Sequence, residues 1–349
     1  MGDHGSATPR LKLTPKERVR RALHRELVDR LPTQCNYTAT LGKKLAKHFK
    51  IPPSELDARL DNHIFRVDVK CPKRFSEDGR IALDWWGAGW STETEGYWHS
   101  FAPLANADDL AHFPWPDADD PHLLEDAGSG IAAHRQLFAV PNLGMCLFER
   151  AWSLRGFNRL LMDMVERLEW VEHLLDRITE IQVRLSQRFL EIGVDGGYFG
   201  DDYGAQYSML FSPQLWRRLI KPRLTRMFAV FRDAGLPVIF HSDGDIRAIL
   251  PDLVEIGITA LNPVQPEVLD HGWLSQEFGA ELSFYGGIST QVVLPKTDEE
   301  AVRQATMKCA RQLAPSGTGL LLGPSHRMQS DIPPRSVEAM LQAFRQLGA

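Results

Sequence analysis

Short apolar runs alternate with helical stretches along the C-terminal half of the chain, and this alternation constrains the fold more than any other feature. Five runs of strand length lie at residues 194–200, 236–241, 258–264, 281–287 and 319–325. Amphipathic stretches follow them, as at residues 212–234 and 298–313. Strands that alternate with helices at this spacing form a parallel sheet with crossover helices. A chain of 349 residues leaves room for three more units upstream, so the sequence predicts a (β/α)8 (TIM) barrel.

The main alternative to a barrel is an open, doubly wound sheet. Such a sheet commonly carries a glycine-rich phosphate loop after an early strand, with the pattern G-x-G-x-x-G or G-x-x-x-x-G-K-[ST]. The sequence contains neither pattern. We therefore expect residues 13–349 to form a single barrel domain, preceded by a flexible polar tail at residues 1–12.

Two additions to the barrel are expected in the N-terminal part of the chain. Thr14, Pro15 and Glu17 have the spacing of a helix start, with Thr14 as the N-cap, so a helical extension precedes a first strand at residues 32–37. Residues 80–104 are rich in glycine, threonine and aromatic residues and partly alternate, which predicts a β-hairpin appendage outside the barrel core.

Charge, hydropathy and cysteine usage bear on whether the protein binds nucleic acid, associates with a membrane or forms disulfides. The net charge is −5 and the basic and acidic residues are interleaved, so no electrostatic argument favours a nucleic-acid partner. No run approaches the length of a transmembrane helix, so no membrane association is expected. The four cysteines are widely spread and form no C-x-x-C pair, which fits a reducing, cytoplasmic location.

Polar residues follow each of the late apolar runs. The active site of a (β/α)8 barrel lies at the carboxyl ends of its strands, so these residues are candidates for binding and catalysis. They are Asp201, Asp202 and Gln206; His241 and Asp243; Asn262 and Gln265; Ser289 and Gln291; Ser325, His326, Arg327 and Gln329; and, further upstream, Glu149 and Arg150. The set is rich in His, Asp, Asn and Gln, which favours a pocket over an ordinary exposed surface.

His241 and Asp243 are separated by one residue at the end of the run "LPVIFH". Alternate residues of a strand face the same side, so both side chains can project into the mouth of the barrel. His326 follows another strand, and the three residues form a two-histidine, one-carboxylate set that suits zinc or another divalent ion. A structural histidine and a helix-capping aspartate are the ordinary alternatives for the first two residues.

The sequence resembles the uroporphyrinogen decarboxylase-like superfamily along most of its length. The stretches that carry the resemblance include "FERAWSLRGFNRLLMD", "GYFGDDYGAQ", "HSDGDIRAILPDLVEIGITALNPVQP", "FYGGISTQ" and "LLLGPSHRMQSDIPPRSVEAM". The resemblance implies a (β/α)8 barrel, often a homodimer. It also implies one of two activities, which are cofactor-free decarboxylation of uroporphyrinogen and zinc-dependent transfer of a methyl group to or from a corrinoid or a thiol.

Two departures from the family patterns bear on this choice. True decarboxylases carry a stretch of the type R-Q-A-G-R-Y whose arginines neutralise substrate carboxylates, whereas "TQCNYTATLGKKL" here has no arginine. The zinc methyltransferases carry H-x-C and a later Cys, which correspond here to His241-Ser242-Asp243 and to His326. A ligand set without thiolates is harder, and suits polarisation of an oxygen better than activation of a thiol.

The sequence therefore predicts a zinc-dependent methyltransferase that demethylates a small methoxy or otherwise methylated compound. The expected zinc ligands are His241, Asp243 and His326. The chain has no D-x-H-x-x-G corrinoid motif, so a corrinoid on a separate partner protein is the expected methyl acceptor. Glu149, Asp201 and Asp202 are expected to supply a fourth ligand or a proton; Asn262, Gln265, Gln291, Arg327, Trp152 and Tyr203 are expected to contact the substrate, with Trp86 or Tyr198 as further apolar walls.

Two other hypotheses are kept beside this one. The first is a metal-independent decarboxylase or other lyase that acts on a small carboxylic acid or a tetrapyrrole-like compound. It would use Asp202 or Asp243 as the acid/base group, with Arg150 or Arg327 holding a carboxylate. The second is a barrel that binds a ligand or a partner protein without catalysis, in which the polar strand ends contact only neighbouring loops.

Overall fold

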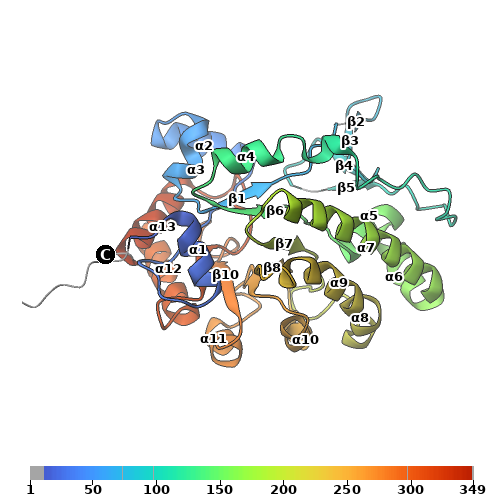
Figure 1. The fold of residues 1–349 in the computed structure, drawn as a ribbon. Coiled ribbons are helices and arrows are strands. Elements are labelled where there is room, and N and C mark those ends of the chain that lie inside the picture. The colour runs from blue at the N-terminus through green and yellow to red at the C-terminus, as the bar shows by residue number, and fades with distance from the viewer. Residues whose placement is uncertain (1–11, 73, 97, 297, 348–349) are drawn as a thin grey trace, which may run out of the picture.

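The computed structural model describes residues 12–347, except for residues 73, 97 and 297. The polar tail expected at residues 1–12 therefore lies, apart from Lys12, outside the described residues. Helices surround a central set of short strands (Figure 1). No helix in the described part of the chain is long and apolar enough to cross a membrane.

The central strands are short and parallel. They are β1 (Ile64–Val67), β6 (Phe138–Pro141), β7 (Gly197–Gly200), β8 (Val238–His241), β9 (Ala260–Asn262), β10 (Ser283–Ile288) and β11 (Leu320–Pro324). The last five coincide with the five apolar runs that were expected to be strands.

Together with the segment that starts at Thr33, these strands close into a barrel. Five of them form one sheet in the order β11–β10–β9–β8–β7, and β1 pairs with β6. A bridge between Leu143 and Phe199 joins the end of β6 to β7. A bridge between Thr33 and Leu322 joins the first segment to β11, and the His63 N–H donates a 3.1 Å hydrogen bond to the Thr33 carbonyl beside β1. The expected (β/α)8 fold is confirmed.

The helices that follow the first barrel segment at Thr33 cover the outside of the barrel, as Figure 1 shows. They are α2 (Ala39–Phe49), α3 (Leu56–Arg59), α4 (Ala127–Ala133), α5 (Phe148–Arg155), α6 (Phe157–Glu166), α7 (Leu168–Glu191), α8 (Pro213–Leu219), α9 (Lys221–Arg232), α10 (Leu250–Glu255), α11 (His271–Phe278), α12 (Glu299–Leu313) and α13 (Pro334–Leu347). Between them and the strands lies the main core, with fully buried Trp216, Phe228 and Phe240. Helices α6 and α7 form a long helical stretch that is interrupted once, at Arg167.

The N-terminal helix α1 (Pro15–Leu23) closes the amino end of the barrel. It begins as predicted, with the Thr14 side chain accepting a hydrogen bond from the Glu17 N–H. Val19 and Leu23 are fully buried and belong to the same interior cluster as the inward-facing strand residues. With this end filled, only the carboxyl ends of the strands are left to form an open mouth.

The expected β-appendage is larger than one hairpin. It is a four-stranded antiparallel sheet of β2 (Arg74–Phe75), β3 (Ile81–Leu83), β4 (Gly89–Ser91) and β5 (His99–Phe101). It packs against α5. The rings of Trp90 and His99 pack edge-on against Trp152, and Arg150 forms a 2.6 Å ion pair with Asp84. Trp152 and Arg150, both considered for substrate contact, therefore attach the appendage to the barrel instead.

Candidate active site

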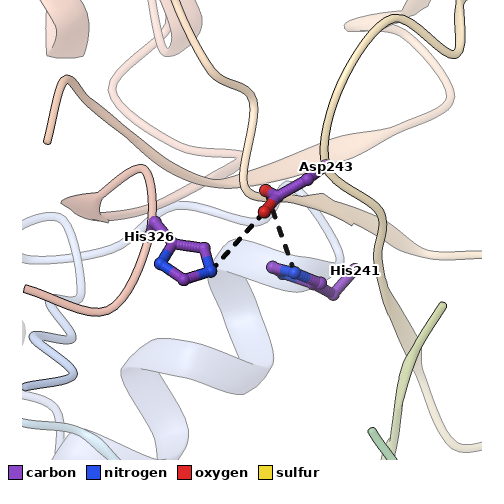
Figure 2. Close-up of side chains that lie close together, drawn as sticks. All are labelled: His241, Asp243 and His326. Carbon is purple, nitrogen blue, oxygen red and sulfur yellow. Dashed lines mark ion pairs between the residues drawn. The ribbon is translucent and has the colours of Figure 1, made fainter. Parts of the chain in front are cut away.

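Three side chains of types that can bind metal converge at the carboxyl ends of β8 and β11. His241 is the last residue of β8, Asp243 follows two residues later, and His326 lies in the loop after β11. We call these three residues the His2Asp cluster. The Nε2 atom of His241 lies 3.9 Å from Oδ1 of Asp243, and Nε2 of His326 lies 3.5 Å from Oδ2 of the same carboxylate (Figure 2). The structure thus brings together the three residues that the sequence analysis combined.

The donor atoms of this cluster fit a divalent cation. One donor atom from each residue lies within 4.8 Å of the others. In tetrahedral zinc sites, with Zn–N bonds of about 2.0 Å, neighbouring donors are about 3.4 Å apart, so small side-chain movements would suffice. The Oδ1 atom of Asp243 is enclosed and has no hydrogen-bond partner among the described residues, which is costly unless a cation satisfies it. The His326 side chain is 43% exposed, so one side of the cluster is open to a substrate.

Asn262, the last residue of β9, fixes the orientation of His241. Its Oδ1 atom lies 2.6 Å from Nδ1 of His241 and accepts a 2.9 Å hydrogen bond from the Tyr198 hydroxyl. Its Nδ2 atom donates to the Tyr285 carbonyl. Because Oδ1 can only accept, Nδ1 of His241 carries a proton, which leaves Nε2, directed at Asp243, as the nitrogen that a metal would use. Asn262 was expected to contact the substrate; it is buried and holds the histidine instead.

Close contact between the loops after β7 and β8 holds Asp243 in place. Gly244 has a φ of +80°, and a Cβ atom there would lie 2.3 Å from the carbonyl carbon of Gly204. Glycine at both positions lets the two backbones touch, and the Asp243 N–H then donates a 2.9 Å hydrogen bond to Oδ1 of Asp202. Gln265, another expected substrate contact, accepts a hydrogen bond from the Gly244 N–H and so supports this loop.

Two further carboxyl groups, those of Asp202 and Glu149, lie near the cluster. Oδ1 of Asp202 lies 3.7 Å from Nε2 of His241. Burial, together with the charges of Asp202 and Asp201, raises the pKa of Glu149 well above its usual value. Burial also raises the pKa of Asp243, although the two histidines oppose this effect. A raised pKa favours the protonated form of a carboxyl group, so Glu149 is the candidate proton donor of the site.

Asp201 is completely buried and organises the start of α5. Its carboxylate accepts hydrogen bonds from the backbone N–H groups of Phe148 and Glu149, at 2.7 and 2.8 Å, and from the Tyr203 hydroxyl at 2.5 Å. Burial raises the pKa of Asp201 to about 7, although the hydrogen bonds that its carboxylate accepts act to lower it. Tyr203 is fully buried as well. The expected roles of Asp201 in catalysis and of Tyr203 in substrate contact are therefore corrected, since both residues position the helix that carries Glu149.

The last two expected substrate contacts lie in loops at the mouth. Gln291 is exposed in the loop after β10. Arg327 follows His326 and is partly buried. The role of both residues in substrate contact stays a prediction.

Arg66 on β1 is a candidate that the sequence analysis missed. It follows Ile64 by two residues, so both side chains face the barrel interior. Its guanidinium carbon lies 4.2 Å from the centre of the Tyr198 ring, and Tyr198 contacts Asn262. The signal was the arginine inside the apolar run "HIFRV", at the spacing of an inward-facing residue.

Comparison with known proteins gives both a family and a fold. The family model for uroporphyrinogen decarboxylase (URO-D) matches residues 146–347, more than half of the chain. A methyltransferase from Methanosarcina mazei is 18% identical, with a TM-score of 0.73 over 97% of this chain and 100% of its own. A B12-independent methionine synthase from Shewanella sp. W3-18-1, in complex with selenomethionine, is 9% identical, with a TM-score of 0.50 over 91% of this chain and 98% of its own. At such identities the likeness shows the fold alone. No curated protein sequence matches the chain.

Proposed function

Because the chain belongs to the uroporphyrinogen decarboxylase (URO-D) family and carries the His2Asp cluster at its barrel mouth, we propose that it is a zinc-dependent methyltransferase. The observation that carries the proposal is the convergence of His241, Asp243 and His326 around an enclosed carboxylate oxygen without a hydrogen-bond partner. The shared fold with a protein described as a methyltransferase, along the whole length of both chains, supports the reaction class.

The ligand set suggests the kind of methyl donor. Two imidazoles and one carboxylate, with no thiolate, form a hard set of donors. Zinc bound there would act as a Lewis acid toward an oxygen of the substrate. The donor that suits this chemistry is a small methoxy compound. Asn262 contributes by holding Nε2 of His241 toward the cluster, and Asp202 by holding the backbone of Asp243.

Glu149 completes the proposed reaction as an acid. The bond between the substrate oxygen and its methyl carbon breaks, and the oxygen keeps the bonding electrons. The methyl carbon bonds to a nucleophile on the acceptor, which supplies the electron pair of the new bond. The oxygen then takes a proton from Glu149, whose pKa is raised. A corrinoid on a separate protein is the proposed acceptor, because the chain lacks the D-x-H-x-x-G motif.

Metal content tests the proposal most directly. Wild type and the variants His241→Ala, Asp243→Asn and His326→Ala would be purified without chelator, supplied with zinc and analysed by elemental mass spectrometry. His112→Ala is the matched control, because His112 lies in an exposed loop. We expect about one zinc per chain in the wild type and the control, and its loss in the three variants.

A methyl-transfer assay then tests the reaction. Methoxylated aromatic compounds would be mixed with zinc-loaded protein and free cob(I)alamin, and methylcobalamin would be followed by its absorption spectrum. Formation that depends on zinc and on His241 supports the proposal. Absence of zinc from the wild type after reconstitution would contradict it. Turnover of a small acid without metal would favour the lyase hypothesis instead.

A further inference from the structure

Arg66 lies on β1 and carries a positive charge into the barrel mouth. Its strand, β1, is separated from β8 by β6 and β7. Arg66 and the interior residue Ile64 share the inner face of β1. The guanidinium stacks on the Tyr198 ring with a separation of 4.2 Å.

A short chain of contacts connects Arg66 with the His2Asp cluster. The Tyr198 hydroxyl donates to Oδ1 of Asn262, and the same oxygen accepts from Nδ1 of His241. On the other side, the guanidinium interacts with the hydroxyl of Tyr285, which accepts a 3.1 Å hydrogen bond from Asn36. Arg66 therefore belongs to the same polar mouth as the cluster, in direct contact with the tyrosine that supports Asn262.

The charge of Arg66 has no carboxylate partner. Among the described residues, no Asp or Glu forms an ion pair with it, and its Nε atom is enclosed without a hydrogen-bond partner. In the described part of the chain, the four buried arginines are each paired with a carboxylate: Arg18 with Asp29, Arg150 with Asp84, Arg155 with Asp163 and Arg223 with Asp176. Arg66 is half-buried, and its polar contacts are with the hydroxyls of Tyr198 and Tyr285. A guanidinium enclosed without an anion is costly, because water no longer solvates it and no counter-charge replaces the water.

We propose that Arg66 binds a carboxylate of the substrate, so that the methyl donor is a methylated carboxylic acid with its methylated oxygen at the His2Asp cluster. The carboxylate of the substrate would form the ion pair that no described Asp or Glu forms with Arg66. A guanidinium presents two parallel N–H groups that match the two oxygens of a carboxylate, so it fixes the direction of the substrate as well as binding it. The identity of the methylated group rests on the proposed function, whereas the anion site rests on Arg66 alone.

Ligand binding measures the anion site without turnover. Isothermal titration calorimetry would compare 2-, 3- and 4-methoxybenzoate with the corresponding neutral methoxybenzamides, on zinc-loaded wild type, Arg66→Gln and Arg66→Lys. Arg59→Gln is the matched control, because Arg59 also stacks on an aromatic ring, that of Phe49, but lies outside the mouth. We expect at least one acid to bind more tightly than its amide, and Arg66→Gln to weaken that acid about 10-fold or more while leaving the amide unchanged. Arg66→Lys should restore part of the preference, and Arg59→Gln should behave as wild type.

The same titration on metal-free His241→Ala separates this inference from the proposed function. A preference for the acid that depends on Arg66 and persists without zinc supports the anion site even if the zinc hypothesis fails. Zinc bound normally with no preference for any acid over its amide overturns the anion site and leaves the proposed function standing. An equal loss of acid and amide binding in Arg66→Gln also overturns it, because the arginine would then act only through the shape of the mouth.

Discussion

Asn262 determines which nitrogen of His241 is available to a metal. Its amide is held from two sides, by the Tyr198 hydroxyl and the Tyr285 carbonyl, so its oxygen cannot turn away from Nδ1 of the histidine. The result is a histidine with its proton on the far side from Asp243. Such supporting hydrogen bonds orient a metal ligand before the metal arrives.

The variant Asn262→Ala should bind zinc about 10- to 100-fold more weakly than the wild type, because His241 then loses its fixed tautomer and orientation. Zinc affinity can be measured by competition with a chromophoric chelator. Tyr198→Phe keeps the amide and removes only one of its supports, so its loss should be smaller. Equal zinc affinity in Asn262→Ala and the wild type would show that the hydrogen bond does not matter for binding.

Glu149→Gln separates the acid role of Glu149 from its effect on stability. Its pKa in the folded protein is raised well above the usual 4.5 by burial and by Asp202 and Asp201. As pH rises above 4.5, the unfolded chain releases this proton while the folded protein keeps it, so folding stability falls through that window. The glutamine variant does not titrate, and it should be more stable than the wild type near about pH 7 and equal to it below about pH 4.

Thermal unfolding of metal-free protein across this pH range measures the difference. Glu77→Gln, at an exposed turn, is the control and should follow the wild type. Methyl transfer by Glu149→Gln should fall by about 100-fold or more, because the leaving oxygen has no proton donor. A variant that is less stable than the wild type at neutral pH would contradict the raised pKa.

Among the elements, the loops after β7 and β8 act as one unit. Gly204 and Gly244 allow their backbones to touch, and this contact places Asp202 beside Asp243 and His241. The distance between these carboxylates therefore depends on glycine at two positions that carry no functional group.

Gly244→Ala should reduce the free energy of unfolding by more than about 2 kcal/mol and abolish zinc binding. The positive φ alone costs about 1–2 kcal/mol for a residue with a side chain, and the new Cβ would also force the two loops apart. Gly235→Ala is the control, since Gly235 has a φ of +73° and no atom within 4 Å of a Cβ. Gly235→Ala should reduce the free energy of unfolding only by the cost of the positive φ, and it should still bind zinc. Urea unfolding and metal analysis give the two readouts.

Helix α1 serves the barrel by filling its amino end. Leu23 is fully buried in the interior cluster, whereas Leu27, just after the helix, is 76% exposed. Leu23→Ala should cost about 2–5 kcal/mol, because it leaves a cavity at the base of the barrel. Leu27→Ala should stay within about 0.5 kcal/mol of the wild type. Urea unfolding followed by tryptophan fluorescence compares the two, and similar losses would mean that α1 does not seal the barrel.

At the scale of the molecule, a closed barrel carries a small antiparallel sheet that packs against its helix α5. The barrel strands are buried on both faces, with every residue of β10 and β11 buried. The strands of the appendage are mostly exposed or half-buried, and β2 is exposed throughout. The two sheets should therefore differ in local stability, because the exposed strands of the appendage bury few apolar side chains.

Hydrogen exchange followed by mass spectrometry should show this difference. We expect the amides of β10 and β11 to exchange slowest and those of β2–β5 to exchange fastest among the strands. Addition of zinc should slow exchange in the loops after β8 and β11, which carry the His2Asp cluster, and leave the appendage unchanged. Appendage amides as protected as those of β10 would contradict this division.

Much of the architecture followed from local patterns. The apolar runs coincide with β7–β11 because a strand buried on both faces must be apolar throughout. The N-cap at Thr14 was readable because capping depends on a few consecutive residues. The appendage was recognised as β structure, but its four-stranded form was not, since β2 is only two residues long.

The sequence by itself determined the barrel and the pairing of His241 with Asp243, because strand periodicity is a property of neighbouring residues. Only the tertiary structure decided that Asp202 lies beside His241 while Asp201 holds α5, that Asn262 serves the histidine, and that Arg66 enters the mouth without a carboxylate partner among the described residues. Each of these depends on segments far apart in the chain, such as those of Asp202 and Asp243, which are 41 positions apart. Closure of the ring creates those contacts, and no local pattern encodes them.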